Sequence, residues 1–187
     1  MKIIGITGKS GSGKSTLTEL LSEKLACQSV NVDKIGHQAT NDEKITEKLC
    51  EIFGQEILDE NKKVDRKKLG NLVFSDTKKM DQLTEVTWGY MQNVLDDILN
   101  KQPEIIILEW ALLPIDEKYW NQCDIKILMK AEDDKRKNKV MERDKITEDY
   151  FLKREKNSMN YDQYEFDYVF ENDYQIETME KIVTIFK

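Results

Sequence analysis

The chain opens with Met1-Lys2-Ile3-Ile4-Gly5-Ile6-Thr7-Gly8-Lys9-Ser10-Gly11-Ser12-Gly13-Lys14-Ser15, in which an apolar run leads into a glycine-rich turn. The part Gly8-x-x-x-x-Gly13-Lys14-Ser15 fits the phosphate-binding loop pattern in full. Residues 2–7 predict a short buried strand, and residues 16–24 predict a helix. A strand, a glycine loop and a helix start in this order present backbone N–H groups to an anion, so we expect a nucleotide phosphate to bind here.

The loop carries the side chains that phosphoryl transfer requires. Lys14, in an exposed loop, would reach the β- and γ-phosphates of ATP, and the Ser15 hydroxyl would ligate Mg²⁺. ATP and Mg²⁺ are therefore the expected cofactors, and an ordinary Gly/Ser turn is the alternative. The residues of this stretch that we expect to contact the nucleotide are Gly8, Ser10, Gly11, Ser12, Gly13, Lys14, Ser15 and Thr16.

Composition narrows the class of protein. A chain of 187 residues is long enough for one domain with a real core. The net charge of −7 argues against general affinity for nucleic acid or acidic membranes. The three cysteines lack metal-ligand spacing and indicate reduced thiols in a cytoplasm. We expect a cytoplasmic protein without a signal peptide or membrane span, as a monomer or weak homo-oligomer.

Four further segments predict strands, and helical patterns separate them, which favours a parallel sheet. These segments are residues 29–32, 104–108, 124–129 and 167–170. Residues 36–102 contain no predicted strand and read as a helical insertion over the strand carboxyl ends, where open α/β sheets bind ligands. Asp65 and Asp76 can cap two of its helices.

Apolar periodicity gives each helix of the insertion a buried face. The predicted faces are Ile45, Leu49, Ile52 and Phe53 in the first helix, Leu69, Leu72 and Val73 in the second, and Met80, Leu83, Thr87, Tyr90, Val94 and Ile98 in the third.

Residues 132–158 are rich in charge, and Thr147 is a predicted N-cap between two helices. Charge alone favours a solvated helix pair, but beside a phosphate loop an arginine-bearing lid is what phosphoryl transfer uses. The expected organisation is a single domain with a core of residues 1–35, 103–131 and 159–187, an insertion of residues 36–102 and a lid of residues 132–158.

Several segments together resemble the dephospho-coenzyme A kinase family over nearly the whole chain. They are the opening block through Thr16, Val30-Asn31-Val32-Asp33-Lys34-Ile35, Val64-Asp65-Arg66 with Leu69 and Val73-Phe74, Arg143-Asp144, Arg154, and Asp167-Tyr168-Val169 with Asn172. The resemblance implies a three-layer α/β/α fold of the P-loop kinase type, with a five-stranded parallel sheet, a helical insertion and a lid.

The resemblance also implies roles for individual residues. Asp33 falls at the family's catalytic aspartate, where a carboxylate accepts the proton of an attacking hydroxyl; a ligand to Mg²⁺-bound water or a helix cap is the alternative. Arg143 and Arg154 fall at lid arginines, and Arg143 is the candidate for the transferring phosphate, with a surface ion pair as the alternative. Asn172 falls at the asparagine that ends the final strand and is a nucleotide-binding candidate.

Two more residues are candidates for the acceptor side of the site. Arg66 could contact acceptor phosphates or be a surface arginine. Glu109 follows the apolar third strand and could hold Mg²⁺ through water, lie beside the substrate, or be an exposed strand end.

The chain departs from the family pattern at several positions. Asn31 stands where the family usually has a second aspartate, and Trp88-Gly89 where it has a His-Pro pair. Glu109-Trp110 replaces the start of the usual Asp-x-Pro sequence. Arg136 and Lys139 replace the usual glutamine and first lid arginine. Most of these departures fall in the acceptor half.

The resemblance implies ATP-dependent phosphorylation of the ribose 3′-hydroxyl of dephospho-coenzyme A, the last step of coenzyme A synthesis. The partner is then a small molecule, with no role for nucleic acid or membrane. A nucleoside or nucleotide kinase of the uridine-kinase type and a nucleotide-binding protein without turnover are the two alternatives.

Overall fold

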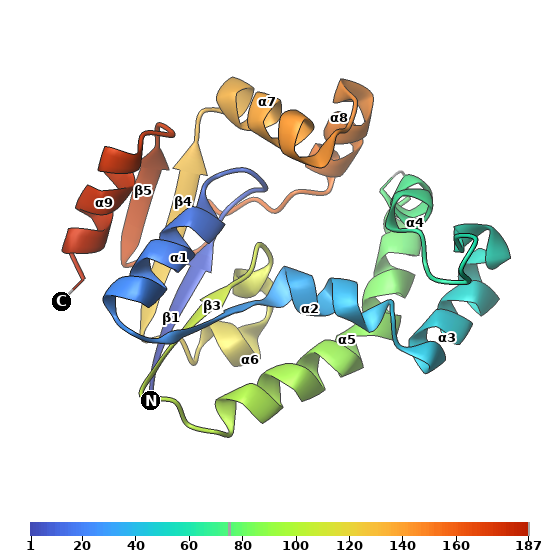
Figure 1. Cartoon of the computed structure of the whole chain (residues 1–187), viewed down its shortest axis with the longest axis horizontal. Coiled ribbons are helices and arrows are strands. Elements are labelled where there is room, and N and C mark those ends of the chain that lie inside the picture. Colours follow the sequence, from blue (N-terminus) through green and yellow to red (C-terminus); the bar gives the residue numbers. More distant parts are fainter. Residues whose placement is uncertain (75, 187) are drawn as a thin grey trace. The chain divides into compact units, whose positions relative to one another are not determined.

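The computed structural model describes residues 1–74 and 76–186, and the chain divides into two compact units (Figure 1). Unit 1 comprises Met1–Asn31, Gln102–Phe151 and Ser158–Lys187. Unit 2 comprises Val32–Lys101 and Leu152–Asn157. Within the described ranges, none of the helices combines the length and apolar character needed to cross a membrane.

Unit 1 is built on a five-stranded sheet with the order β2-β3-β1-β4-β5, in which every neighbouring pair is parallel (Figure 1). The strands are β1 Lys2–Thr7, β2 Gln28–Asn31, β3 Ile105–Glu109, β4 Ile125–Ala131 and β5 Tyr168–Asn172. The predicted five-stranded parallel sheet is therefore confirmed. Because all strands are parallel, the ends of β1, β3 and β4 place the phosphate loop, Glu109 and the start of the charged segment at one edge of the sheet.

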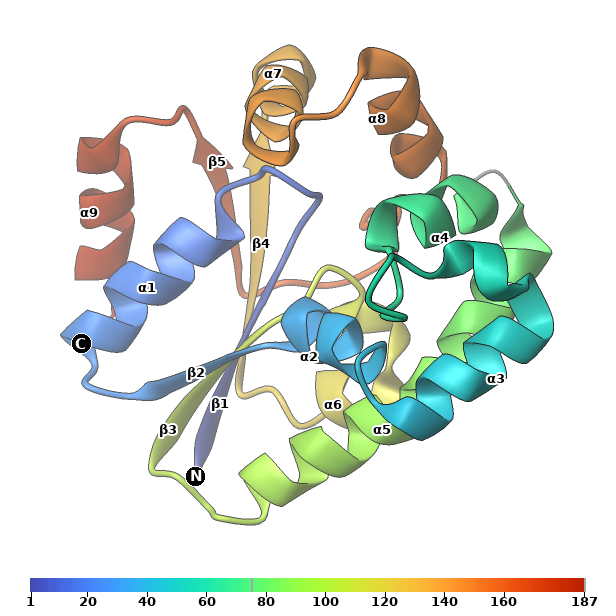
Figure 2. The same ribbon diagram turned by 45° about the vertical axis from the view of Figure 1, so that its right-hand side comes forward.

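Helices cover both faces of this sheet. The helical elements that include unit 1 residues are α1 Lys14–Lys24, η2 Leu113–Ile115, α6 Glu117–Trp120, α7 Asp133–Asp144, α8 Glu148–Lys156 and α9 Ile176–Thr184. Ile4 and Ile6 pack in one buried cluster with residues of α1 and α9, which lie side by side (Figure 2). Side chains alternate along a strand, and a Cβ on Gly5 would meet Cys123 and Leu113, so η2 and the segment after α6 cover the opposite face. The three-layer α/β/α fold is thus confirmed.

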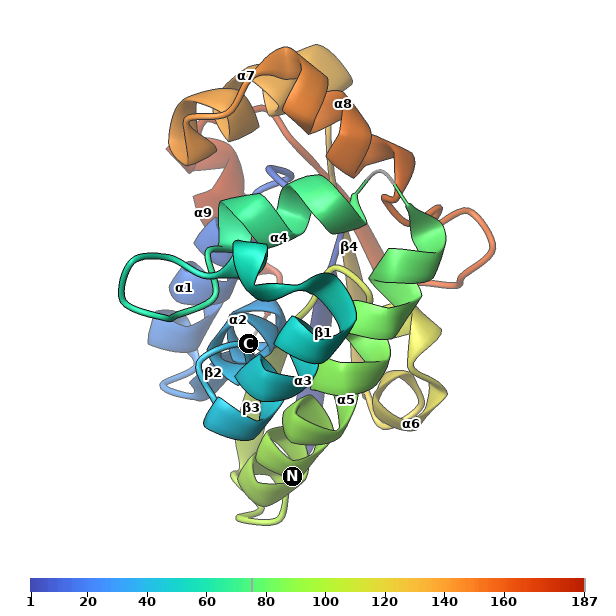
Figure 3. The ribbon, with the colours of Figure 1, turned by 90° about the vertical axis from the view of Figure 1, so that its right-hand side faces the viewer.

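Unit 2 contains a helical core (Figure 3). Its elements are α2 Val32–Ala39, α3 Glu43–Phe53, η1 Gln55–Ile57, α4 Arg66–Val73 and α5 Thr77–Leu99. Asp42, Asp65 and Asp76 cap α3, α4 and α5, because each carboxylate accepts two backbone N–H groups of the following turn. The caps predicted at Asp65 and Asp76 are confirmed.

The structure corrects three details of the sequence analysis. Val32 belongs to α2 and not to β2, so Asp33 lies in the first turn of a helix. Ile52 is 41% exposed, so it is not part of the buried face of α3. On α5 the predicted Thr87 is buried, and the predicted Met80, Leu83 and Tyr90 pack partly buried against the unit 2 core. Farther along the helix the buried positions are Leu95 and Leu99, one residue beyond the predicted Val94 and Ile98, which are half-buried.

Candidate active site

Gly11 and Gly13 of the phosphate loop hold a backbone conformation that only glycine adopts easily. Gly11 and Gly13 have φ values of 82° and 96°, in the left-handed region. A Cβ on Gly11 would come within 2.5 Å of Val140, and a Cβ on Gly13 within 2.2 Å of the Asn172 amide. The loop therefore packs closely against neighbouring segments, and substitution of either glycine would displace it.

Lys14 lies inside the loop, and only 7% of its surface is accessible, whereas an exposed loop was expected. Its ammonium donates to the carbonyl oxygens of Gly8 at 2.9 Å and Lys9 at 3.1 Å. The loop surrounds this ammonium and holds it at the position where a phosphate-binding loop places its lysine beside the β- and γ-phosphates. The prediction that Lys14 sits in an exposed loop is wrong because the loop closes over its own lysine.

Ser15 and Glu109 meet at the end of the sheet. The Ser15 hydroxyl donates to the Glu109 carboxylate at 2.6 Å, although 94 residues separate them in sequence. Glu109 is buried at 4% exposure, and Asn31 of β2 stands opposite it in the strand register. Glu109 is thus not the exposed strand end that was one alternative.

The donor set at this place suits a hard cation that also binds phosphate. Mg²⁺ prefers oxygen ligands and usually takes only one or two of them from the protein. The Ser15 hydroxyl and the Glu109 carboxylate supply such oxygens. Across the described residues, groups of three or more His, Cys, Asp or Glu side chains that could hold a metal are absent.

The loop also contains an unsatisfied polar group. Ser12 is 1% exposed, and its hydroxyl is one of two buried side-chain polar atoms without a hydrogen-bond partner among the described residues. Ser12 and Lys9 line a cavity of about 540 Å³, which the end of β4, the start of α7 and residues 158–162 complete. A buried hydroxyl of this kind is available to a polar ligand.

Arg143 lies beside the phosphate loop. Its guanidinium donates to the Ser10 hydroxyl at 3.3 Å and grips the Asp144 carboxylate through two nitrogens. The hydrogen bond that Arg143 donates to the Asp144 carboxylate raises the pKa of Arg143, and the nearby Glu109 carboxylate acts in the same direction. The surface ion pair that was the alternative is therefore present, together with a contact to the loop.

The side chain of Asn172 also contacts the loop, at a backbone carbonyl. The buried Asn172 amide donates to the Ser12 carbonyl at 3.1 Å. Direct contact of Asn172 with a nucleotide stays a prediction.

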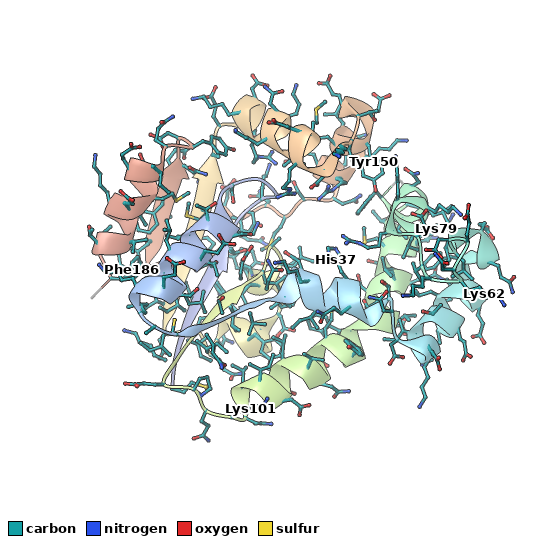
Figure 4. All side chains as sticks on the ribbon, in the orientation of Figure 1. His37, Lys62, Lys79, Lys101, Tyr150 and Phe186 are labelled. Atoms are coloured by element: carbon teal, nitrogen blue, oxygen red, sulfur yellow. The ribbon has the colours of Figure 1, made fainter. Side chains whose placement is uncertain are left out.

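Three of the candidate acceptor residues, Asp33, Arg66 and Arg154, lie in unit 2, and Glu109 lies in unit 1. Asp33 is half-buried in the first turn of α2. Arg66 is exposed at the first position of α4, and its guanidinium lies 2.8 Å from His37 Nε2; Figure 4 labels His37 on α2. The Arg154 guanidinium lies above the Phe74 ring, 6.0 Å from its centre. The functional roles of all three stay predictions.

Sequence analysis missed two residues at the loop. Arg136 donates to the Ser10 carbonyl, and Tyr174 donates to the Gly11 carbonyl. Arg136 precedes Arg143 by seven residues, a spacing that places both on one helix face and could have indicated a shared target. No local signal marks Tyr174.

Comparisons with known proteins identify the family of this chain. The family model described as dephospho-CoA kinase matches residues 2–178. The dephospho-CoA kinase of Borreliella burgdorferi is 33% identical over 138 residues, which cover 74% of this chain and 66% of that protein. The dephospho-CoA kinase of Fusobacterium nucleatum is 29% identical over 186 residues, which cover 98% and 96% of the two chains.

Solved structures share the fold. The crystal structure of TT1252 from Thermus thermophilus has a TM-score of 0.78 at 27% identity and covers 98% of this chain and 95% of that one. The shikimate kinase from Acinetobacter baumannii has a TM-score of 0.60 at 15% identity and covers 99% and 92%. The second likeness supports the fold alone. From the family model and the relatives together, the chain belongs to the dephospho-CoA kinase family.

Proposed function

We propose that this chain transfers the γ-phosphate of ATP to the ribose 3′-hydroxyl of dephospho-coenzyme A, with the residues named below in the stated roles. As a member of the dephospho-CoA kinase family, the chain is an ATP-dependent kinase of the last step of coenzyme A synthesis. The observation that carries the proposal is the phosphate loop that closes on Lys14 while Ser15 pairs with the buried Glu109.

On ATP binding, the Lys14 ammonium exchanges its two carbonyl partners for oxygens of the β- and γ-phosphates. The loop backbone N–H groups from Gly11 to Thr16 bind the remaining phosphate oxygens. The planar guanidinium of Arg143, which contacts Ser10 of the loop, donates hydrogen bonds to the transferring phosphate. These groups concentrate positive charge where negative charge develops in the transition state.

Ser15 and Glu109 would hold Mg²⁺, the Glu109 carboxylate directly or through water. When bound, the cation neutralises charge on the β- and γ-phosphate oxygens. Glu109 also orients the Ser15 side chain, because the 2.6 Å hydrogen bond between them fixes the direction of the hydroxyl.

Asp33 is the proposed general base, and the support for this role is its match to the family's catalytic aspartate. The ribose 3′-hydroxyl gives its proton to the Asp33 carboxylate, its oxygen forms the new bond to the γ-phosphorus, and the bond to the β-phosphate oxygen breaks to release ADP. Arg66 and Arg154 are proposed to bind the diphosphate of the acceptor. Asn172 is proposed to act by fixing the Ser12 carbonyl.

We further propose that the protein works in a cytoplasm as a monomer or weak homo-oligomer. Its three cysteines are free thiols, and burial raises the pKa of Cys123 to about 12, which keeps that thiol unreactive. Sedimentation at several protein concentrations measures the oligomeric state.

The function is tested with radiolabelled ATP and four acceptors: dephospho-coenzyme A, adenosine, uridine and cytidine. The proposal predicts labelled product with dephospho-coenzyme A alone. Labelling of a nucleoside and not of dephospho-coenzyme A would identify a kinase of another acceptor. Tight ATP binding without any labelled product would favour a nucleotide-binding protein without turnover.

A further inference from the structure

Two side chains from outside the phosphate loop hold neighbouring carbonyl groups of the loop. Arg136 Nη1 donates to the Ser10 carbonyl at 3.2 Å, and the Tyr174 hydroxyl donates to the Gly11 carbonyl at 3.0 Å. The two donors come from α7 and from the turn between β5 and α9, 126 and 163 residues away from their acceptors. Both contacts lie within unit 1.

Arg136 is fixed on every side. Only 2% of its surface is accessible, and its Nε and Nη2 donate to Asp133 Oδ1 at 3.2 and 2.8 Å. Its guanidinium also lies 5.5 Å from the centre of the Phe151 ring. Burial of a guanidinium is unfavourable unless its hydrogen bonds are made. Here the planar guanidinium makes them by donating to Asp133 and to the Ser10 carbonyl at the same time.

Tyr174 holds an unfavourable backbone conformation. Its φ is 68°, in the left-handed region that a bulky side chain rarely occupies. Two hydrogen bonds keep it there: its N–H donates to the Asn172 side chain at 2.8 Å, and its hydroxyl donates to Gly11. Strain of this kind persists where the surrounding structure over-determines it, often at a functional site.

We propose that Arg136 and Tyr174 are positioning residues that hold the phosphate loop in its ATP-binding shape. Their bonds engage the Ser10 and Gly11 carbonyls with donors of unit 1. A loop carbonyl that turned toward the phosphates would repel an anion. Arg136 has a second effect, because Arg143 of the same helix donates to the Ser10 hydroxyl. Ser10 is thus held at its carbonyl by one arginine and at its hydroxyl by the other. This inference rests on the proposed ATP-dependent function.

A loop that is already ordered loses less conformational freedom when it binds a ligand. Loss of either contact should therefore weaken the binding of ATP and leave the binding of the acceptor unchanged. Tyr174→Phe removes only the hydroxyl, so the KM for ATP should rise about 3- to 10-fold, as expected for one neutral hydrogen bond. Arg136→Met keeps the buried aliphatic part of the side chain and should raise the KM for ATP on the order of 10- to 100-fold.

Two control variants remove a tyrosine hydroxyl and a cation whose described contacts do not involve the loop. Tyr168→Phe lies in β5, where its ring contacts Phe170 and Phe186. Lys137→Met removes a cation of α7 that pairs with Glu148. Both controls should keep the KM for ATP. Arg136→Lys should recover only part of the loss, because one ammonium does not reproduce the fork.

The experiment measures both KM values, kcat, thermal unfolding and the affinity for a non-hydrolysable ATP analogue. The expected pattern is a rise in the ATP constants with an unchanged KM for dephospho-coenzyme A. In an Arg143→Ala background, Arg136→Met should raise the KM for ATP by a smaller factor than it does alone, because the two arginines act on the same residue. If the folded Tyr174 and Arg136 variants match their controls while the unmodified chain is active, the inference is wrong. If the unmodified chain itself lacks turnover, the proposed function fails instead.

Discussion

The phosphate loop and the candidate acceptor residues differ in what holds them. Five successive loop carbonyls, from Gly8 to Ser12, accept hydrogen bonds from side chains, three of them from residues more than a hundred positions away. Arg66 instead lies exposed on a capped helix, and its contact with His37 stays within unit 2. The loop is therefore held by contacts from several segments of unit 1, whereas the described contact of Arg66 comes from one neighbouring helix of unit 2. Substitutions on the two sides should separate into effects on ATP and effects on the acceptor.

The largest effect is expected on the nucleotide side, from Lys14→Ala. It removes the buried ammonium that the Gly8 and Lys9 carbonyls hold, so kcat/KM should fall on the order of 10³-fold. The measurement is the steady-state rate, with thermal unfolding to show that the variant folds. Lys137→Met is the matched control. Near-normal turnover in folded Lys14→Ala would remove the loop from the mechanism.

Asp33→Asn should lower kcat on the order of 10²-fold, within the range that general base catalysis supplies. The affinity for ATP should stay close to that of the unmodified chain, because the base acts on the acceptor hydroxyl. Single-turnover rates and calorimetric ATP binding separate these quantities. A collapse of ATP binding would instead assign Asp33 to the Mg²⁺ environment.

Arg66→Ala sharpens the comparison from the acceptor side. Loss of one charge-assisted contact should raise the KM for dephospho-coenzyme A about 10-fold and leave the KM for ATP unchanged. Lys67→Ala, in the same exposed turn, is the control. Equal effects of the two substitutions would make Arg66 a surface arginine that contributes only general charge.

The smallest effect concerns stability and not turnover. Asp65→Ala removes the cap of α4 and should cost about 1 kcal/mol of unfolding free energy at neutral pH. Backbone hydrogen bonds from Lys68 and Lys67 lower the pKa of Asp65, so its stabilising effect is present above the pKa of the unfolded chain and is lost as the pH falls through the folded value. Denaturant unfolding at pH 7 and pH 3 should show the difference shrink. A constant difference would mean that the cap does not act through its charge.

The parts of the molecule that the sequence predicted are the locally encoded ones. The loop pattern, the β1 apolar run and the caps at Asp65 and Asp76 each depend on residues within a few positions. On α5 the last part of the predicted face was one residue off, because the long helix has apolar residues at adjacent positions such as Val94 and Leu95 and only packing decides between them.

Contacts between distant segments could not be predicted in this way. The bond from Ser15 to Glu109 was not expected, although each residue had been chosen separately as a candidate for Mg²⁺. Arg136 was read as a departure from a family pattern within a charge run, and its burial follows from the packing of α7 on the loop. Tyr174 became visible only through its backbone angle and its bond to Gly11.

Identification of the product tests the central claim most directly. The unmodified chain is incubated with ATP, Mg²⁺ and dephospho-coenzyme A, and the product is examined by phosphorus–proton correlation NMR. The account predicts one new phosphate coupled to the ribose 3′ proton of the adenosine, with one ADP formed for each. A phosphate at any other position, or ATP consumed without phosphorylated dephospho-coenzyme A, would contradict it.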